Sequence, residues 1–82
     1  MNTAVTTRVR EYILGAFLPG EDPNELKDDT PLISGGILDS IATLKLVMFI
    51  EEEFGVQVQA HEADKEHLDT IADIVSLIAS KK

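Results

Sequence analysis

The sequence predicts an all-α protein, a small four-helix bundle with three long helices, one short helix and a long first loop. Apolar residues recur along three segments at spacings of three and four, and they alternate, as strands require, far less often. The chain also has 82 residues, a length at which one modest core is all that can be buried. We therefore expect residues 1–82 to form a single domain.

A first helix is expected from about Thr3 to Phe17, followed by a long loop. The apolar residues on one side of this helix are Val5, Val9, Tyr12, Ile13 and Phe17. Pro19-Gly20 ends the helix. The stretch from Leu18 to Asp39 shows no helical or strand period, and loops this long are usually functional or disordered. Its apolar residues argue that it is pinned to the core, and they are Leu26, Leu32, Ile33, Ile37 and Leu38.

A second helix is expected from Ser40 to Phe54. Asp39 and Ser40 both belong to the residue types that cap helix N-termini, because their side-chain oxygens accept hydrogen bonds from free backbone N–H groups. Gly55 stands where a glycine commonly follows a helix. The three residues after it, 56–58, are expected to form a short extended link.

A weak helical turn is expected near Glu62–His67, and a last helix from about Thr70 to Ser80. One face of the last helix carries Ile71, Ile74, Val75 and Ile78. Asp69 and Thr70 are expected to cap this helix, and the two C-terminal lysines lie favourably at its negative end.

The second helix has two separate faces when about 100° is added per residue. The wider, more apolar face is expected to meet the core and holds Thr43, Leu46, Val47, Ile50 and Phe54. A second face, here called the docking stripe, holds Ile41, Lys45, Met48 and Glu52. Its mixed character fits scattered surface residues, burial under the long loop, or a partner-docking surface in which flexible Met48 suits several partners.

The charge and composition exclude several classes of protein. Fifteen acidic residues against seven basic ones give a net charge of −8, which repels nucleic acid and anionic membranes and favours basic patches on other proteins. The same acidity also suits a domain that simply stays in solution. No apolar run approaches the roughly 20 residues of a membrane span, and Met1–Arg10 lacks the pattern of a secretory signal, so a cytoplasmic location is expected. With no cysteine, disulfides and thiolate metal sites are excluded.

Ser40 stands where a glycine-rich loop meets the second helix, and by pattern alone it is a helix cap. A nucleophilic serine needs a base and an oxyanion hole. The chain's histidines are His61 and His67, and no G-x-S-x-G motif surrounds the serine, so a hydrolase is disfavoured. The histidine spacing fits no standard metal site, and both side chains are expected in solvent.

Several segments together resemble the signature of acyl carrier proteins. They are Asp39-Ser40-Ile41, the helix end Glu51-Glu52-Glu53-Phe54-Gly55-Val56, the upstream Asp29-Thr30-Pro31-Leu32 and the downstream Leu68-Asp69-Thr70-Ile71-Ala72-Asp73. The resemblance covers nearly the whole chain and includes the helix order, the long first loop and the acidic charge, so the expected bundle is acyl-carrier-like.

The resemblance implies that Ser40 carries a 4′-phosphopantetheine arm. In that family a phosphopantetheinyl transferase moves the arm from coenzyme A to the serine, and Asp39 is implied to help position the transferase and its metal. A phosphodiester on Ser40 would lie at the positive end of the second helix. The arm's thiol would hold a substrate as a thioester, so the chain itself is expected to be a carrier and no enzyme.

The resemblance also implies partner-recognition roles for the docking stripe. Ile41, Met48 and Glu52 match positions that the family's partners grip, whereas Ala42 and Lys45 stand where acidic residues are common in fatty-acid carriers. Because charge governs partner choice, the usual fatty-acid synthase partners become doubtful. The form Gly36-Ile37-Leu38-Asp39-Ser40 also resembles standalone carriers of amino acids, including D-alanyl carriers, and of specialised pathways. The resemblance therefore implies a specialised polyketide, nonribosomal peptide or aminoacyl-transfer pathway. The implied partners are a loading ligase or transferase and downstream biosynthetic enzymes.

Several alternatives stay open. The chain could serve fatty-acid synthesis, or act as an unmodified carrier-fold adaptor that binds partners without a covalent arm. The carried group could lie between the helices or in solvent. A monomer is expected.

Overall fold

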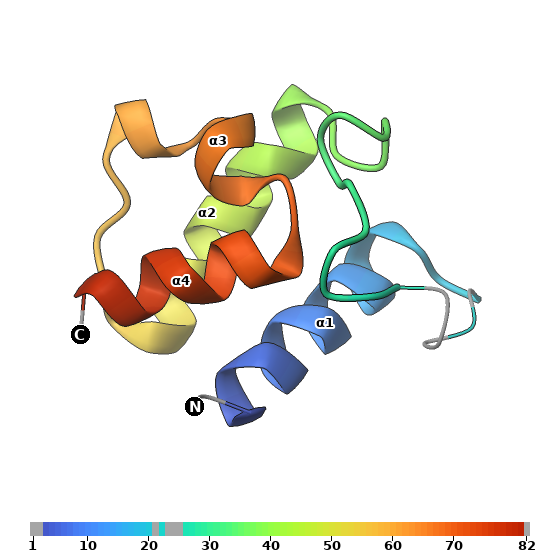
Figure 1. The fold of residues 1–82 in the computed structure, drawn as a ribbon, viewed down its shortest axis with the longest axis horizontal. Coiled ribbons are helices and arrows are strands. Elements are labelled where there is room, and N and C mark those ends of the chain that lie inside the picture. Colours follow the sequence, from blue (N-terminus) through green and yellow to red (C-terminus); the bar gives the residue numbers. More distant parts are fainter. Residues whose placement is uncertain (1–2, 21, 23–25, 82) are drawn as a thin grey trace.

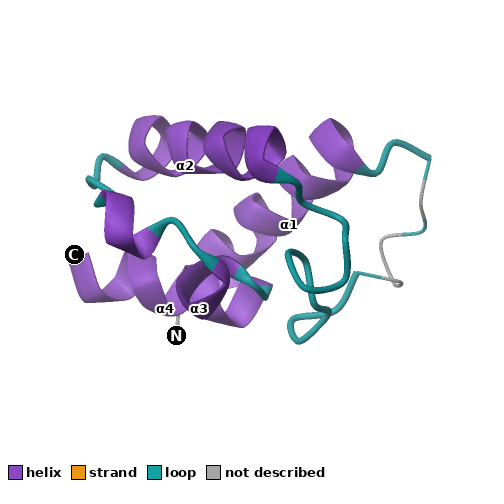
Figure 2. Ribbon diagram, turned by 90° about the horizontal axis from the view of Figure 1, so that it is seen from above, coloured by secondary structure: helices purple, strands orange, loops and turns teal. Residues whose placement is uncertain are grey.

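The computed structural model describes residues 3–20, 22 and 26–81, and in these residues it is all-helical without strands. Its elements are α1 (Thr3–Phe17), α2 (Ser40–Phe54), the 3₁₀ turn η2 (Ala60–Glu62), α3 (Lys65–Leu68) and α4 (Ile71–Lys81). The predicted all-α bundle of three long helices and one short helix is confirmed. α1 packs against α4 and α2, and α3 packs against α4 (Figures 1 and 2).

The core draws its side chains from all three long helices and from the long loop. Its buried apolar members are Val9, Ile13, Leu26, Leu32, Leu38, Leu46, Val47, Ile50, Val58, Leu68, Ile71, Ile74, Leu77 and Ile78. On α2 the buried residues are Thr43, Leu46, Val47 and Ile50, which confirms the predicted core face, and Phe54 at its end is half-buried. On α4, Leu77 joins the predicted face, and Val75 is half-buried.

The long first loop is pinned to the core, as its apolar residues predict. Leu26, Leu32 and Leu38 are buried, and its two isoleucines are half-buried. Arg10 of α1 holds the loop from outside by donating to the Leu26 carbonyl oxygen at 3.2 Å and pairing with the carboxylate of Asp28.

Both ends of α2 follow local chemistry. Asp39 is the N-cap, since its Oδ1 accepts a hydrogen bond from the Ala42 N–H at 2.7 Å, and this decides between the two predicted caps. At the other end Gly55 has a left-handed φ of 68° and donates its N–H to the Glu51 carbonyl oxygen. A residue with a Cβ is disfavoured at such a φ, which explains the glycine.

The C-terminal third corrects two predictions. The expected turn near Glu62–His67 is divided between η2 and α3. The Thr70 hydroxyl caps α4 by accepting from the Asp73 N–H at 3.0 Å, whereas the Asp69 carboxylate bonds to the long loop, so the prediction that Asp69 also caps α4 is wrong.

The end of α4 is tied to the segment that precedes α3. Lys81 forms an ion pair with Glu62, with the Nζ and Oε1 atoms 2.7 Å apart. Lys82 lies outside the described residues. Among the residues that the structure describes, no helix is long and apolar enough to cross a membrane.

Candidate functional site

Ser40 is the first residue of α2 and its side chain is exposed. Because Asp39 supplies the cap, the Ser40 hydroxyl is not needed to satisfy the first turn of the helix. The sequence order Asp-Ser therefore divides two tasks: the aspartate begins the helix and the serine presents a hydroxyl at its N-terminus.

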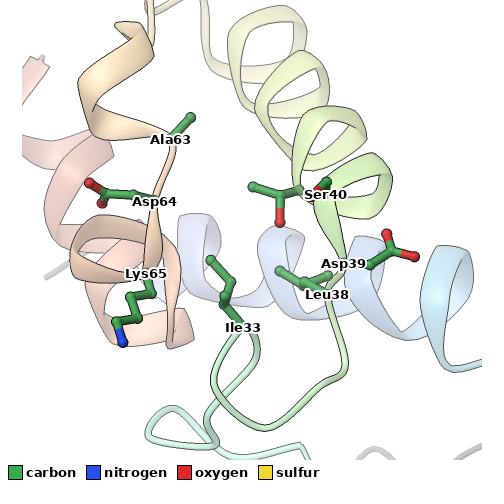
Figure 3. Close-up of a pocket in the computed structure, with 8 residues that line it drawn as sticks. Ile33, Leu38, Asp39, Ser40, Ala63, Asp64 and Lys65 are labelled. Carbon is green, nitrogen blue, oxygen red and sulfur yellow. The ribbon is translucent and has the colours of Figure 1, made fainter.

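An open groove of about 460 Å³ lies beside Ser40. Its lining comes from the long loop, the start of α2 and the segment before α3, and consists of Ile33, Leu38, Asp39, Ser40, Thr43, Ala63, Asp64 and Lys65. In Figure 3, Ile33, Leu38 and Ala63 point toward the space between α2 and the segment 63–65, whereas Asp39 and Lys65 point away from it. The groove thus has apolar walls with charged groups at its rim.

The loop wall of the groove is held by Asp69. Its Oδ1 accepts from the N–H groups of Ile33 and Ser34 at 2.9 and 2.8 Å, and its Oδ2 accepts from Ser34 Oγ at 2.8 Å. These hydrogen bonds lower the pKa of Asp69, and those from the backbone and side chain of Ser34 contribute most. The nearby charge of Lys65 lowers the pKa further, by the smallest contribution. The carboxylate therefore stays ionised where the loop needs an acceptor.

The opposite wall leads into α3, which Asp64 caps. Asp64 Oδ1 accepts from the N–H groups of Glu66 and His67, and it lies 2.9 Å from His67 Nδ1. The hydrogen bond between the side chains lowers the pKa of Asp64 and raises that of His67. His61 is exposed as predicted, and the His67 side chain is 37% exposed but pairs with the Asp64 carboxylate, a contact that the sequence does not predict. The described residues contain no cluster of three or more His, Cys, Asp or Glu side chains that could hold a metal ion.

A phosphodiester-linked arm fits this place. The exposed hydroxyl of Ser40 stands at the positive end of α2, where first-turn N–H groups favour an anion. The groove beside it is open, so an arm on the serine would meet apolar side chains along one side and solvent along the other. The residues present therefore suit a covalently attached 4′-phosphopantetheine.

The docking stripe is exposed along the whole length of α2. Ile41 and Met48 are 67% and 53% exposed, and Lys45 and Glu52 are exposed as well, so burial under the long loop is excluded. Sequence reasoning missed Leu44, which is 60% exposed. A helical projection could have identified Leu44 as a neighbour of the docking stripe, because it lies within about 40° of Met48.

Lys45 lies between two shallow grooves on this face. One groove, of about 260 Å³, is lined by Tyr12, Lys45, Met48, Phe49 and Glu52. The other, of about 270 Å³, is lined by Ala16, Phe17, Asp39, Ile41, Ala42 and Lys45. The ammonium-bearing side chain of Lys45 thus borders both grooves.

Some charged side chains of α2 are engaged in contacts within the fold and others are not. Glu51 accepts from the Val58 N–H at 2.9 Å, and Glu53 pairs with Arg8 at 2.7 Å. In the part of the chain that the structure describes, Glu52 and Lys45 have no ion pair. The exposed face of α2 therefore presents one available anion and one available cation.

Comparison with known proteins agrees with this geometry. The family described as "Phosphopantetheine attachment site" matches residues 13–78. Acyl carrier protein from Thermotoga maritima is 40% identical over 76% of this chain and 74% of its own length. Acyl carrier protein from Solidesulfovibrio magneticus is 30% identical over 96% of both chains. A chain in a structure described as "Crystal structure of FAD-dependent dehydrogenase" has a TM-score of 0.76 and 33% identity, covering 85% of this chain and 97% of that one.

The fold and the family match define a small helical carrier with a covalent attachment site. The chain belongs to the acyl carrier protein family. Members of this family bear a covalently attached 4′-phosphopantetheine, work with phosphopantetheinyl transferases and acyl-handling enzymes, and are carriers and not enzymes.

Proposed function

We propose that this chain, acting as one carrier domain, bears its 4′-phosphopantetheine on Ser40 and delivers acyl or aminoacyl groups to biosynthetic enzymes. The observation that carries the proposal is the exposed hydroxyl of Ser40 at the start of α2, beside an open groove, while Asp39 supplies the helix cap. Thr30, Ser34 and Thr70 instead have hydroxyls engaged in hydrogen bonds within the fold.

The modification is a transfer of a phosphoryl-linked group from coenzyme A. The Ser40 oxygen forms a bond to the phosphorus that carries pantetheine, the bond from that phosphorus to the nucleotide's phosphate oxygen breaks, and 3′,5′-ADP leaves. The hydroxyl proton passes to a base of the transferase. Once attached, the arm supplies a terminal thiol that holds the carried group as a thioester.

The chain's own residues then position the arm and recognise the partner enzymes. Asp39 fixes the start of α2 and offers its second carboxylate oxygen to a docking transferase, and Ile33, Leu38 and Ala63 give the arm an apolar wall. The docking stripe and Leu44 present exposed apolar side chains to partner enzymes, with Lys45 and Glu52 selecting among them by charge.

The partners belong to a specialised polyketide, nonribosomal peptide or aminoacyl-transfer pathway. Lys45 supports this, since a cation between two grooves of the exposed face opposes partners that expect a purely acidic helix. A flavin-dependent oxidation of the carried group is a candidate step, because one structural relative comes from a crystal structure described as that of an FAD-dependent dehydrogenase. Fatty-acid synthesis is the second candidate, equally consistent with relatives named acyl carrier protein.

The test is enzymatic modification followed by intact-mass measurement. The apo chain and its Ser40→Ala variant are incubated with coenzyme A, magnesium and a broad-specificity phosphopantetheinyl transferase. A gain of one phosphopantetheine in the wild type alone is expected. A gain in the variant would place the attachment elsewhere. No gain in either folded protein, with a control carrier modified, would favour the unmodified adaptor.

A further inference from the structure

Asp69, at the junction of α3 and α4, is joined to residues 32–34 of the long loop by four hydrogen bonds. Its carboxylate accepts three of them, from the Ile33 N–H, the Ser34 N–H and the Ser34 hydroxyl. Its backbone oxygen accepts the fourth, from the Leu32 N–H. One residue thus fixes this part of the loop, which is 35 or more positions away in the sequence.

The bonded segment leads directly to Ser40. Ile33 lines the groove beside the serine. The Leu32 carbonyl oxygen accepts from the N–H groups of Ile37 and Leu38 at 2.8 and 2.9 Å, and Leu38 also lines the groove. Hydrogen bonds therefore continue from Asp69 through the loop to the backbone that enters α2.

The opposite wall of the groove belongs to the same junction. Residues 63–65 line that wall and continue into α3, and Asp69 is the residue that ends α3. Figure 3 shows Ile33 and Ala63 on the two sides of the space next to Ser40. Asp69 therefore connects both walls of the groove. It directly follows α3, into which one wall continues, and it binds the backbone of the long loop, which forms the other wall.

We propose that Asp69 is a positioning residue for the modification of Ser40, because its carboxylate holds the two walls of the groove at a fixed separation and so sets the approach to the serine hydroxyl. The inference rests on the proposed function, since it takes Ser40 as the attachment site. The Asp69 carboxylate is free for this task because the Thr70 hydroxyl caps α4.

A carboxylate suits this position better than an amide. Asp69 accepts three hydrogen bonds with two acceptor oxygens, and an asparagine would replace one of these oxygens with a donor facing Ser34. Hydrogen bonds to an ionised acceptor are also shorter and stronger than neutral ones. Asp69→Asn thus weakens the link with the smallest change in shape.

The experiment is steady-state kinetics of modification by a broad-specificity phosphopantetheinyl transferase, with the carrier as the varied substrate. In Asp69→Asn a loosened groove adopts the competent geometry less often, so KM should rise about three- to tenfold while kcat stays within about twofold. Ser34→Ala should raise KM less, and Ser34→Thr, which keeps the hydroxyl, should restore it. The matched control is Asp73→Asn, which removes a carboxylate from the first turn of α4 and should leave both constants unchanged.

Each protein is first shown to be folded by urea unfolding, and the amide NMR signals of Leu38 and Ser40 give a second readout. These signals should move in Asp69→Asn and stay in place in Asp73→Asn. Wild-type KM in Asp69→Asn, or an equal rise in Asp73→Asn, would overturn the inference. If Asp69→Asn does not fold, the two Ser34 variants test the inference, and a wild-type KM in Ser34→Ala would then overturn it. Failure of the proposed function can be distinguished from failure of this inference, because the wild type would then gain no arm or Ser40→Ala would still gain one.

Discussion

Tyr12 of α1 stacks on Phe49 of α2, with ring centroids 4.0 Å apart and ring planes 8° from parallel. The Tyr12 hydroxyl also donates to the Lys45 carbonyl oxygen at 3.2 Å. Both rings and Met48 line the groove on one side of Lys45, so the stack forms part of the exposed surface next to the docking stripe. The position of α2 relative to α1 thus depends on an aromatic pair that is only half-buried.

Two substitutions of Tyr12 separate the stack from the hydroxyl. Tyr12→Phe keeps the ring and loses one exposed hydrogen bond, so the free energy of unfolding should fall by at most about 1 kcal/mol. Tyr12→Leu loses the aromatic pair, worth about 0.5–1.5 kcal/mol beyond buried area, and should be the less stable variant. Urea unfolding followed by circular dichroism compares them. Equal stability of the two variants would show that the stack contributes nothing.

Asp39 should have separable roles in stability and in recognition. Asp39→Ala removes the cap of α2 and should lower the free energy of unfolding by about 1 kcal/mol, whereas Asp39→Asn keeps a capping oxygen and should lower it little. Both variants lose the carboxylate offered to the transferase, so both should be modified more slowly than wild type. Urea unfolding and intact-mass time courses measure the two effects. A fully active Asp39→Asn would limit Asp39 to capping.

Two glycines should respond to alanine in opposite directions. Gly55 has a φ of +68° with open space around its Cα, so Gly55→Ala is strained by backbone conformation alone and should destabilise by about 1–2 kcal/mol. Gly15 lies within α1, also in open space, and Gly15→Ala should stabilise by about 0.5–1 kcal/mol through helix propensity. Thermal and urea unfolding test the pair. A stabilising Gly55→Ala would contradict the importance of the left-handed conformation.

Contacts between residues close in the sequence could be predicted, and distant polar contacts could not. The bounds of α2, its two candidate caps and its core face follow from the Asp39-Ser40 pair, Gly55 and the helical period, because all of these signals are local. Asp69 was misassigned because an Asp-Thr pair before an apolar run is a typical helix start. Its hydrogen-bond partners are residues 32–34, which lie 35 or more positions away, and no periodic pattern marks such hydrogen bonds.

In the candidate site, too, local features could be predicted from the sequence and features that depend on distant segments could not. Ser40 and the exposed stripe could be proposed from the sequence, because a family signature and a helical projection both mark them. The groove beside Ser40 could not, because its walls come from loop and helix segments that meet only in three dimensions. The stacking of Phe49 on Tyr12 could not be predicted either, since it depends on how α1 crosses α2.

The His67–Asp64 pair should make stability depend weakly on pH near neutrality. The hydrogen bond to Asp64 raises the pKa of His67 in the folded chain. The pair's contribution is therefore fully present below the unfolded histidine pKa of about 6.5 and is lost as pH rises through the higher folded value. NMR titration should find the pKa of His67 higher in wild type than in Asp64→Asn. An unchanged pKa would show that the pair does not persist in solution.

Lys45→Glu should change the choice of partner while leaving the fold intact. Lys45 is exposed and has no ion pair among the described residues, so the free energy of unfolding should stay within about 0.5 kcal/mol of wild type. The substitution converts the available cation of the exposed face into an anion between two grooves. A partner that grips an acidic helix should then bind better, and a partner adapted to Lys45 worse.

The measurement uses the holo chain as substrate for the malonyl transferase of fatty-acid synthesis and for an amino-acid-activating ligase that loads the wild type. kcat/KM should rise about tenfold for the transferase and fall about tenfold for the ligase, because mutation of one charge at the rim of an interface acts on association. Lys27→Glu gives the same charge change on an exposed residue of the long loop and serves as the matched control. If both variants shift the two rates alike, net charge governs the effect and Lys45 is no recognition residue. If Lys45→Glu alone shifts them in opposite directions, the exposed cation of α2 separates this carrier's partners from those of fatty-acid synthesis.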